Sequence, residues 1–213
     1  MEAGERPAVL PRGINAASPD AVAASQRARL LAAMKLLSAR DGFPNVTVAC
    51  LVAEAGVSKP TFYLRFSDKE DCFLQLFDEA WEGLLAAMLE AIPRGKDTRE
   101  RIEFGLGTLL EYLAADPDGA KVLLIESQRS GAAATARIGA ARELLAEVFL
   151  SSREALRETN PALGPVSKIR ALAAIGAINE PVVATLRQGR AEDLTELRGE
   201  LLEVLYALSF DAV

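Results

Sequence analysis

Apolar residues recur at intervals of three and four along most of the chain, and proline, glycine and Asx residues interrupt this pattern. Such spacing places one apolar stripe along an α-helix, whereas a half-buried strand needs strict alternation, which no segment sustains. The sequence therefore predicts an all-α protein. We expect helices over residues 24–39, 47–56, 59–66, 68–92, 98–115, 117–128, 132–158, 166–187 and 192–208.

Length and hydropathy limit the class of protein. The chain has 213 residues, half of them apolar, which is enough to bury a core in one domain or in a small head on a larger body. We find no uninterrupted apolar run of the roughly 18 residues that a membrane span needs, and residues 1–20 lack the apolar core of a secretion signal. We therefore expect a soluble, cytoplasmic protein that contacts no membrane.

The side chains that most metal sites and enzymes use are sparse. The chain contains no histidine, and its two cysteines, Cys50 and Cys72, fit neither a disulfide framework nor a zinc-binding pattern. We expect both thiols to be packing residues on helices. We also find no nucleophile–base pair and no glycine-rich phosphate loop. The sequence predicts no metal, no cofactor and no enzymatic activity.

Charge is distributed unevenly along the chain. The net charge is −6, yet residues 21–66 carry six basic and two acidic residues, whereas residues 76–213 carry 15 basic and 22 acidic residues. A basic head on an acidic body is compatible with nucleic-acid binding that is confined to the head.

Two short helices joined by a glycine turn are predicted between residues 47 and 66. Thr47 and Ser58 are suitable N-caps, Gly56 supplies the turn, and Pro60 is tolerated in the first turn of the second helix. This helix-turn-helix arrangement presents the N-terminal residues of its second helix to the major groove of DNA, which is about 12 Å wide.

Residues 55–58 read Ala-Gly-Val-Ser, residues 61–63 read Thr-Phe-Tyr, and Phe66 and the pair at residues 69–70, Lys-Glu, follow. This order of motifs strongly resembles the TetR family of bacterial regulators, and the resemblance is close over residues 26–77. One departure is Arg65, where the family more often has histidine or tyrosine. The remainder of the chain resembles the family in length, helical content and its apolar final pair of helices.

The resemblance implies that residues 23–69 form a DNA-binding domain. Thr47 and Tyr63 would donate hydrogen bonds to phosphates, and Lys69 would be a phosphate cation. Phosphate contacts position the protein, and contacts to base edges select the sequence. The expected DNA-binding residues are Thr47, Ser58, Lys59, Pro60, Thr61, Tyr63, Arg65 and Lys69.

Two accessory regions of the head are considered as well. Arg27 and Arg29 are possible further contacts to DNA. Residues 1–22 are predicted as a flexible arm, whose Arg6 and Arg12 could reach a minor groove. A disordered tail is the preferred interpretation of this arm, given its two glutamates.

The resemblance also implies that residues 70–213 form a helical body for effector binding and dimerisation. Since histidine is absent, a lipophilic or acyl-type effector is favoured over a metal chelate. Core packing is the alternative role for each pocket candidate. The pocket candidates are Trp81, Met88, Phe104, Tyr112, Gln128, Phe149 and Asn179. The candidates for a dimer interface, on helices that could pair in a four-helix bundle, are Leu172, Ile175, Leu194, Leu197, Leu201 and Leu205.

The sequence thus predicts a ligand-responsive repressor, a homodimer that binds a palindromic operator in double-stranded DNA and is released by a small lipophilic effector. The helix over residues 68–92 joins head to body and is the expected lever. Two alternatives stay open. One is an all-α interaction protein that binds no DNA, which the acidic net charge favours, and the other is a DNA-binding regulator, repressor or activator, that needs no effector.

Overall fold

The computed structural model describes residues 18–159 and 164–209, and this part of the chain contains helices and no strand. The all-α prediction is therefore confirmed. The head consists of α1 (Pro19–Asp41), α2 (Val48–Ala55) and α3 (Lys59–Tyr63). The body consists of α4 (Lys69–Ala91), α5 (Thr98–Ala115), α6 (Pro117–Leu124), α7 (Ala132–Thr159), α8 (Lys168–Arg187) and α9 (Arg198–Ser209). Four 3₁₀ segments connect them: η1 (Phe43–Asn45), η2 (Ile92–Arg94), η3 (Glu126–Arg129) and η4 (Ala191–Leu197).

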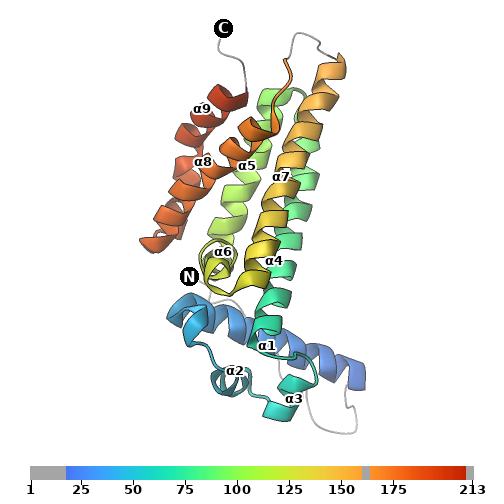
Figure 1. The fold of residues 1–213 in the computed structure, drawn as a ribbon, viewed down its shortest axis with the longest axis vertical. Coiled ribbons are helices and arrows are strands. Elements are labelled where there is room, and N and C mark those ends of the chain that lie inside the picture. Colours follow the sequence, from blue (N-terminus) through green and yellow to red (C-terminus); the bar gives the residue numbers. More distant parts are fainter. Residues whose placement is uncertain (1–17, 160–163, 210–213) are drawn as a thin grey trace.

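The head forms the base of the molecule, and the body stands on it (Figure 1). The helix α1 crosses below the long helices α4, α5 and α7, while α6 lies between α1 and the rest of the body. The final helices α8 and α9 pack side by side along one flank.

Local capping explains where the helices of the head begin and end. The side chains of Ser18, Thr47 and Ser58 each accept a hydrogen bond from the amide three residues later. These bonds satisfy amides that have no partner within the first helical turn. Gly56 ends α2 in a left-handed conformation, with φ of 61°, which glycine adopts without steric cost. The predicted caps at Thr47 and Ser58 and the turn at Gly56 are confirmed.

Two boundaries in the head differ from the prediction. The first helix begins at Pro19 because Ser18 caps it, so residues 19–22 belong to α1 rather than to an arm. The rest of the predicted arm, with Arg6 and Arg12, lies outside the described residues. The helix α3 ends at Tyr63 rather than at residue 66, since the amides of Arg65 and Phe66 both donate to the Phe62 carbonyl and close a turn there.

Two predicted helices of the body are each divided. The segment 117–128 becomes α6 followed by η3, and the segment 192–208 becomes η4 followed by α9. A 3₁₀ turn has three residues instead of 3.6, and apolar spacings of three and four are compatible with either geometry. As a result, Leu194 and Leu197 lie on η4, and Leu201 and Leu205 lie on α9.

One apolar core extends through both head and body. The helix α4 joins the two parts, because its buried Phe73 packs on Phe43 of the head with ring centroids 4.7 Å apart. Further along the same helix, Leu84 is buried among the helices of the body. The helix α4 is therefore packed against both the head and the body.

One helix in the described ranges, Lys168–Arg187, is long and apolar enough to cross a membrane, with 33% of its apolar window buried inside the fold. Core helices of globular proteins meet the same criterion of length and composition. In this fold the helix packs against α7 and α9.

Candidate functional site

Most side chains of α3 and of the turn that follows it face solvent. Lys59, Pro60, Tyr63 and Arg65 are exposed, and Leu64 keeps 76% of its accessible surface. The opposite side of α3 anchors it, because the Phe62 ring is completely buried. This short helix is thus a rigidly held ridge at the tip of the head (Figure 1).

The polar groups of this ridge fall into two kinds. The Lys59 and Arg65 side chains make no ion pair or hydrogen bond with the described residues, so their charges are available to a partner. The hydroxyls of Ser58 and Thr61 lie 2.8 Å apart and are hydrogen-bonded to each other. Thr47 is exposed, and its oxygen accepts from the Cys50 amide.

Lys69 is engaged by the backbone of the head. Its ammonium donates to the carbonyl oxygens of Phe43, Pro44 and Val46 at 3.3, 3.3 and 3.0 Å, and it lies 4.6 Å from the centroid of the Phe43 ring. An ammonium group has three donors, and all three are used here. A phosphate contact by Lys69 would have to replace at least one of these bonds.

Arg27 and Arg29, the possible accessory contacts, also have partners inside the protein. The Arg29 guanidinium donates to the carbonyl oxygens of Ala55 and Gly56, at 2.8 and 3.2 Å, and so binds the C-terminal end of α2. Arg27 bonds to Gln75 and to Glu79 on α4. Arg29 thus holds the head together, and Arg27 connects the head to the body.

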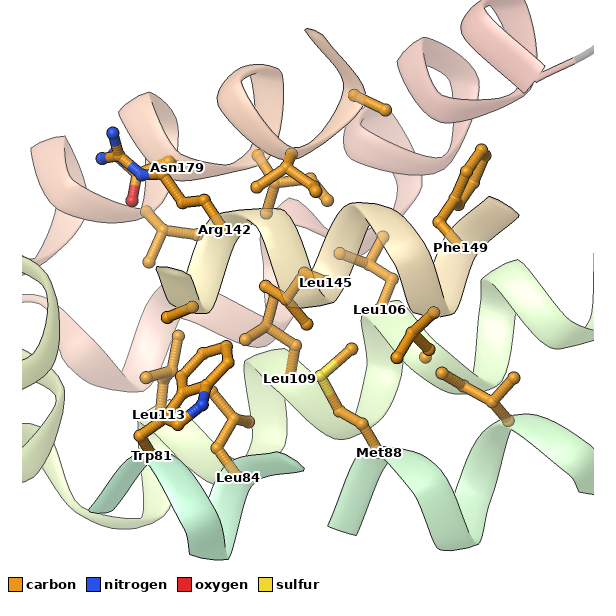
Figure 2. Close-up of a pocket in the computed structure, with 18 of the residues that line it drawn as sticks. Trp81, Leu84, Met88, Leu106, Leu109, Leu113, Arg142, Leu145, Phe149 and Asn179 are labelled. Carbon is orange, nitrogen blue, oxygen red and sulfur yellow. The ribbon is translucent and has the colours of Figure 1, made fainter. Parts of the chain in front are cut away.

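The body contains a partly open cavity of about 190 Å³, lined mainly by α4, α5, α7 and α8 (Figure 2). Its wall is mainly aliphatic and aromatic, with polar side chains at few positions. The residues labelled in Figure 2 are Trp81, Leu84, Met88, Leu106, Leu109, Leu113, Arg142, Leu145, Phe149 and Asn179. An apolar cavity with a few polar groups is the usual form of a site for a small molecule.

Five of the seven pocket candidates line this cavity, namely Trp81, Met88, Gln128, Phe149 and Asn179. Phe104 does not line it, because it lies on the outer face of α5 with 41% of its surface exposed. Tyr112 does not line it either. Its hydroxyl donates to the Ala80 carbonyl at 3.1 Å, and burial raises the pKa of the phenol.

The sequence interpretation missed much of the wall. Several leucines and the three arginines that line the cavity, Arg101, Arg142 and Arg153, were not among the candidates. The leucines have the same helical spacing as any core residue, so periodicity cannot separate cavity from core. Arg153 is buried and donates to Thr98 Oγ1 and to the Gly164 carbonyl, at 3.5 and 3.4 Å.

Half of the residues expected at a dimer interface are buried within the single chain instead of lying on its surface. Leu194, Leu201 and Leu205 are buried in the chain's own core, with Leu194 completely inaccessible, so a second copy could not contact them. Ile175 lines the cavity, and Leu172 and Leu197 are half-buried. The division of this segment at η4 turns its leucines inward against α5 and α8. The large apolar side chains that α8 and α9 expose are Ile169, at 79%, and Val204, at 42%.

The two cysteines differ in environment. Cys72 is buried on α4, and this burial raises the pKa of its thiol to about 12, as suits a packing residue. Cys50 is exposed on α2, 3.2 Å from the Thr47 hydroxyl, so the prediction that it packs in the core is wrong. The signal was ambiguous because α2 is short and apolar on more than one face.

Head and cavity are connected through η3. The buried carboxylate of Glu126 accepts a hydrogen bond of 2.8 Å from the Phe43 amide of the head. The next two residues, Ser127 and Gln128, line the cavity. A second link is the ion pair between Lys35 of α1 and Asp116, which caps α6. Besides α4, two contacts therefore connect the body to the head, and one of them belongs to η3, which also lines the cavity.

Comparisons with known proteins agree with this architecture. Residues 30–76 match the sequence profile described as bacterial regulatory proteins, tetR family. An uncharacterized HTH-type transcriptional regulator from Haemophilus influenzae is 32% identical over 120 residues, which cover 56% of this chain and 58% of that protein. The chain thus matches somewhat more than half the length of this relative.

Similar solved structures cover more of the chain. The transcriptional regulator FadR from Bacillus subtilis, in complex with stearoyl-CoA, has a TM-score of 0.75 at 22% identity, over 84% of this chain and 97% of that one. The fatty acid degradation regulator FadR from Bacillus halodurans has a TM-score of 0.73 at 22% identity, over 85% and 95% of the two chains. Residues 30–76 thus match the helix-turn-helix domain of the tetR family of bacterial regulatory proteins, and the chain as a whole shares the fold of the two FadR regulators, so these matches support that family.

Proposed function

We propose that this protein is a cytoplasmic transcriptional repressor that binds a palindromic operator as a homodimer and is released by a small lipophilic effector. The observation that carries the proposal is the exposed ridge of α3 at the tip of the head. Its cations, Lys59 and Arg65, have no partner within the described residues, whereas other cations of the head make internal contacts. Cations that have no internal partner are the groups that neutralise phosphates.

The α3 ridge supports a DNA-binding role in detail. Lys59, Pro60 and Thr61 stand at the start of the helix, where they would face base edges in the major groove. Thr47, Tyr63 and Arg65 surround them as phosphate contacts, and Ser58 orients the first turn. Lys69 contributes through the backbone that it holds.

The cavity supports an effector of the lipophilic, acyl type. Its aliphatic wall suits an alkyl chain, since each buried methylene is stabilised by about 0.8 kcal/mol. The similar fold solved with stearoyl-CoA is that of the FadR regulator from Bacillus subtilis.

A homodimer would use the outer faces of α8 and α9. Ile169 and Val204 are the exposed apolar side chains available there, in place of the inward-facing leucines. Two heads joined in this way would address half-sites roughly 34–36 Å apart.

Effector binding could act on the head through α4 and η3, which line the cavity and contact the head. The effector must bind one arrangement of the two heads more tightly than the other, since equal affinity would shift nothing. Release then follows when the favoured arrangement no longer matches the spacing of the half-sites.

Selection of bound fragments from a random DNA pool identifies the operator, and a salt series then tests the proposal. Affinity should fall steeply with rising salt. The double variant Lys59→Ala with Arg65→Ala should lose about tenfold or more in operator affinity, and its salt slope should decrease by about 0.9 for each phosphate that is no longer neutralised. Fluorescence anisotropy measures both quantities.

A matched control removes one arginine and one lysine from the body, by Arg94→Ala and Lys96→Ala in the η2 region, far from α3. This control should bind the operator as the wild type does. Failure of the wild type to bind any DNA at low salt would contradict the proposal and favour an interaction protein. Operator binding that no lipophilic ligand alters would favour an effector-independent regulator.

Glu126→Ala should weaken the response to the effector. The substitution leaves the buried Phe43 amide without its acceptor, which costs about 1–3 kcal/mol, and it removes one of the links between cavity and head. Glu126→Gln keeps an acceptor oxygen and should behave nearly as the wild type. The measurement is the stearoyl-CoA concentration that releases half of the operator, compared with ligand affinity in the absence of DNA. Equal release by all three proteins at equal ligand affinity would show that η3 transmits nothing.

A further inference from the structure

We infer that the effector is an anionic amphiphile, an inference that rests on the proposed effector cavity. Its charged group is bound by Arg142 of α7 and Asn179 of α8, and its alkyl chain extends along α4 toward Met88 and Phe149 (Figure 2). The inference names the chemical class of the ligand and the residues that select it.

The charge of the cavity wall points to an anion. The segment 76–213 carries more acidic than basic residues, yet none of the residues that line the cavity is acidic, while three are arginines. An arginine stays charged at any physiological pH, so every charged side chain in the cavity wall is a cation. A cationic amphiphile is disfavoured by the same charges.

Among the three cavity arginines, Arg142 differs in having no partner within the described residues. Arg101 Nε donates to the Gly95 carbonyl at 3.1 Å, and Arg153 donates to Thr98 and to Gly164. By contrast, the Arg142 guanidinium makes no hydrogen bond or ion pair with any residue in the ranges 18–159 and 164–209. Its planar donors match the two oxygens of a carboxylate or phosphate.

Asn179 adds a second donor at the same end of the cavity. Figure 2 shows Arg142 and Asn179 at the end that Trp81 also lines. The Asn179 carboxamide has no hydrogen-bond partner within the described ranges, and its NH₂ group can donate two bonds to an anion. Trp81 precedes Met88 on α4, which starts at the head, so this polar end is the one nearer to the DNA-binding part.

The opposite part of the cavity accepts the chain of the ligand. Beyond Trp81 the wall continues with the uncharged residues Leu84, Met88, Leu109, Leu145 and Phe149. Arg101 and Arg153 line the wall as well, and both donate to groups of the protein itself, namely Gly95, Thr98 and Gly164. Since Arg142 itself is exposed, a head group larger than a carboxylate can extend from the cavity into solvent. A free fatty acid and an acyl thioester of a phosphorylated carrier therefore share the chemistry that this site recognises.

The experiment uses the full-length protein and its own fluorophore, because Trp81 is the single tryptophan of the chain and lines the cavity. Titrations of Trp81 fluorescence with palmitate, stearoyl-CoA and uncharged hexadecanol compare the head groups. We expect at least one of the two anionic ligands to bind about tenfold or more tightly than the alcohol. Binding of palmitate alone identifies a carboxylate head, and binding of stearoyl-CoA alone identifies the phosphorylated carrier.

Arg142→Ala should weaken binding of the anionic ligand by about tenfold or more and leave hexadecanol unchanged. Asn179→Leu should produce a smaller loss of the same selectivity. Because Arg142 is exposed, its variant should keep the wild-type circular dichroism and thermal midpoint. The control is Arg187→Ala, which removes the same charge from an exposed position of α8 outside the cavity wall and should alter nothing.

Hexadecanol binding as tight as that of the anions, with no effect of Arg142→Ala, would overturn the anionic head group and leave a lipophilic effector in place. A flat Trp81 response to all three ligands would overturn this inference together with the effector part of the proposed function. Operator binding, measured separately, is unaffected by either outcome.

Discussion

Replacing Phe62 with alanine is expected to lower the free energy of unfolding by about 3–5 kcal/mol. The Phe62 ring has no accessible surface and packs on Phe66 with ring centroids 5.5 Å apart, so its removal leaves a cavity in the smallest part of the core. The loss is a large fraction of the about 5–15 kcal/mol that stabilises a typical domain. Urea titration followed by far-UV circular dichroism measures it, and operator binding should be lost in parallel.

The matched control is Leu64→Ala, two residues away. Leu64 keeps 76% of its surface exposed, and the loss of its apolar atoms there should change stability by no more than about 0.5 kcal/mol. Equal effects of the two substitutions would contradict the orientation of α3, because that orientation is what distinguishes the two side chains.

Leu194→Ala is expected to cost about 2–5 kcal/mol of unfolding free energy through the core of a single chain. Leu194 is completely buried on η4, which packs against α5 and α8. The loss should be the same at low and high protein concentration, and the oligomeric state measured by sedimentation should not change. Leu89→Ala, at a half-exposed position on α4, is the control and should have little effect on stability.

A contact between subunits at Leu194 would give a different result. The variant would then keep the stability of the isolated chain and dissociate at low concentration. Ile169→Ala and Val204→Ala are the substitutions expected to act in that way, since these side chains remain exposed on α8 and α9.

The negative net charge of the chain is reconciled with DNA binding by the position of its cations. Most cations of the head already have partners within the protein, namely Arg27, Arg29 and Lys35. Lys69 donates to three backbone carbonyls. The cations near α3 that have no partner within the described residues, Lys59 and Arg65, are few, but they lie on the exposed ridge. The sum of charge in the head therefore overstates the number of cations that a phosphate could meet.

Local sequence was sufficient where neighbouring residues decide the structure. Thr47, Ser58 and Gly56 act on amides and carbonyls within a few residues, so the caps and the turn could be predicted from residue type and spacing. The helix Thr98–Ala115 was predicted with its observed limits, since Asp97 caps it and Asp116 and Pro117 follow it. The motif from residue 55 to residue 70 indicated the family for the same reason.

The burial and the hydrogen-bond partners of individual side chains depended on residues that are distant in the chain. Lys69 meets the carbonyls of residues 43, 44 and 46 only after the head has folded, and the leucines at 194 and 201 turn inward only because η4 packs on α5. Apolar spacing is the same for a core, a cavity wall and an interface between subunits, so it could not distinguish Phe104 from Leu106.

The sequence by itself determined a helical chain with a capped helix-turn-helix head, because capping and helical periodicity arise from interactions within one or two turns. Only the tertiary structure decided which cations have no internal partner, which leucines become core and which arginines line the cavity. Those outcomes depend on packing between segments far apart in the chain, where burial and the choice of hydrogen-bond partners are set by the whole fold.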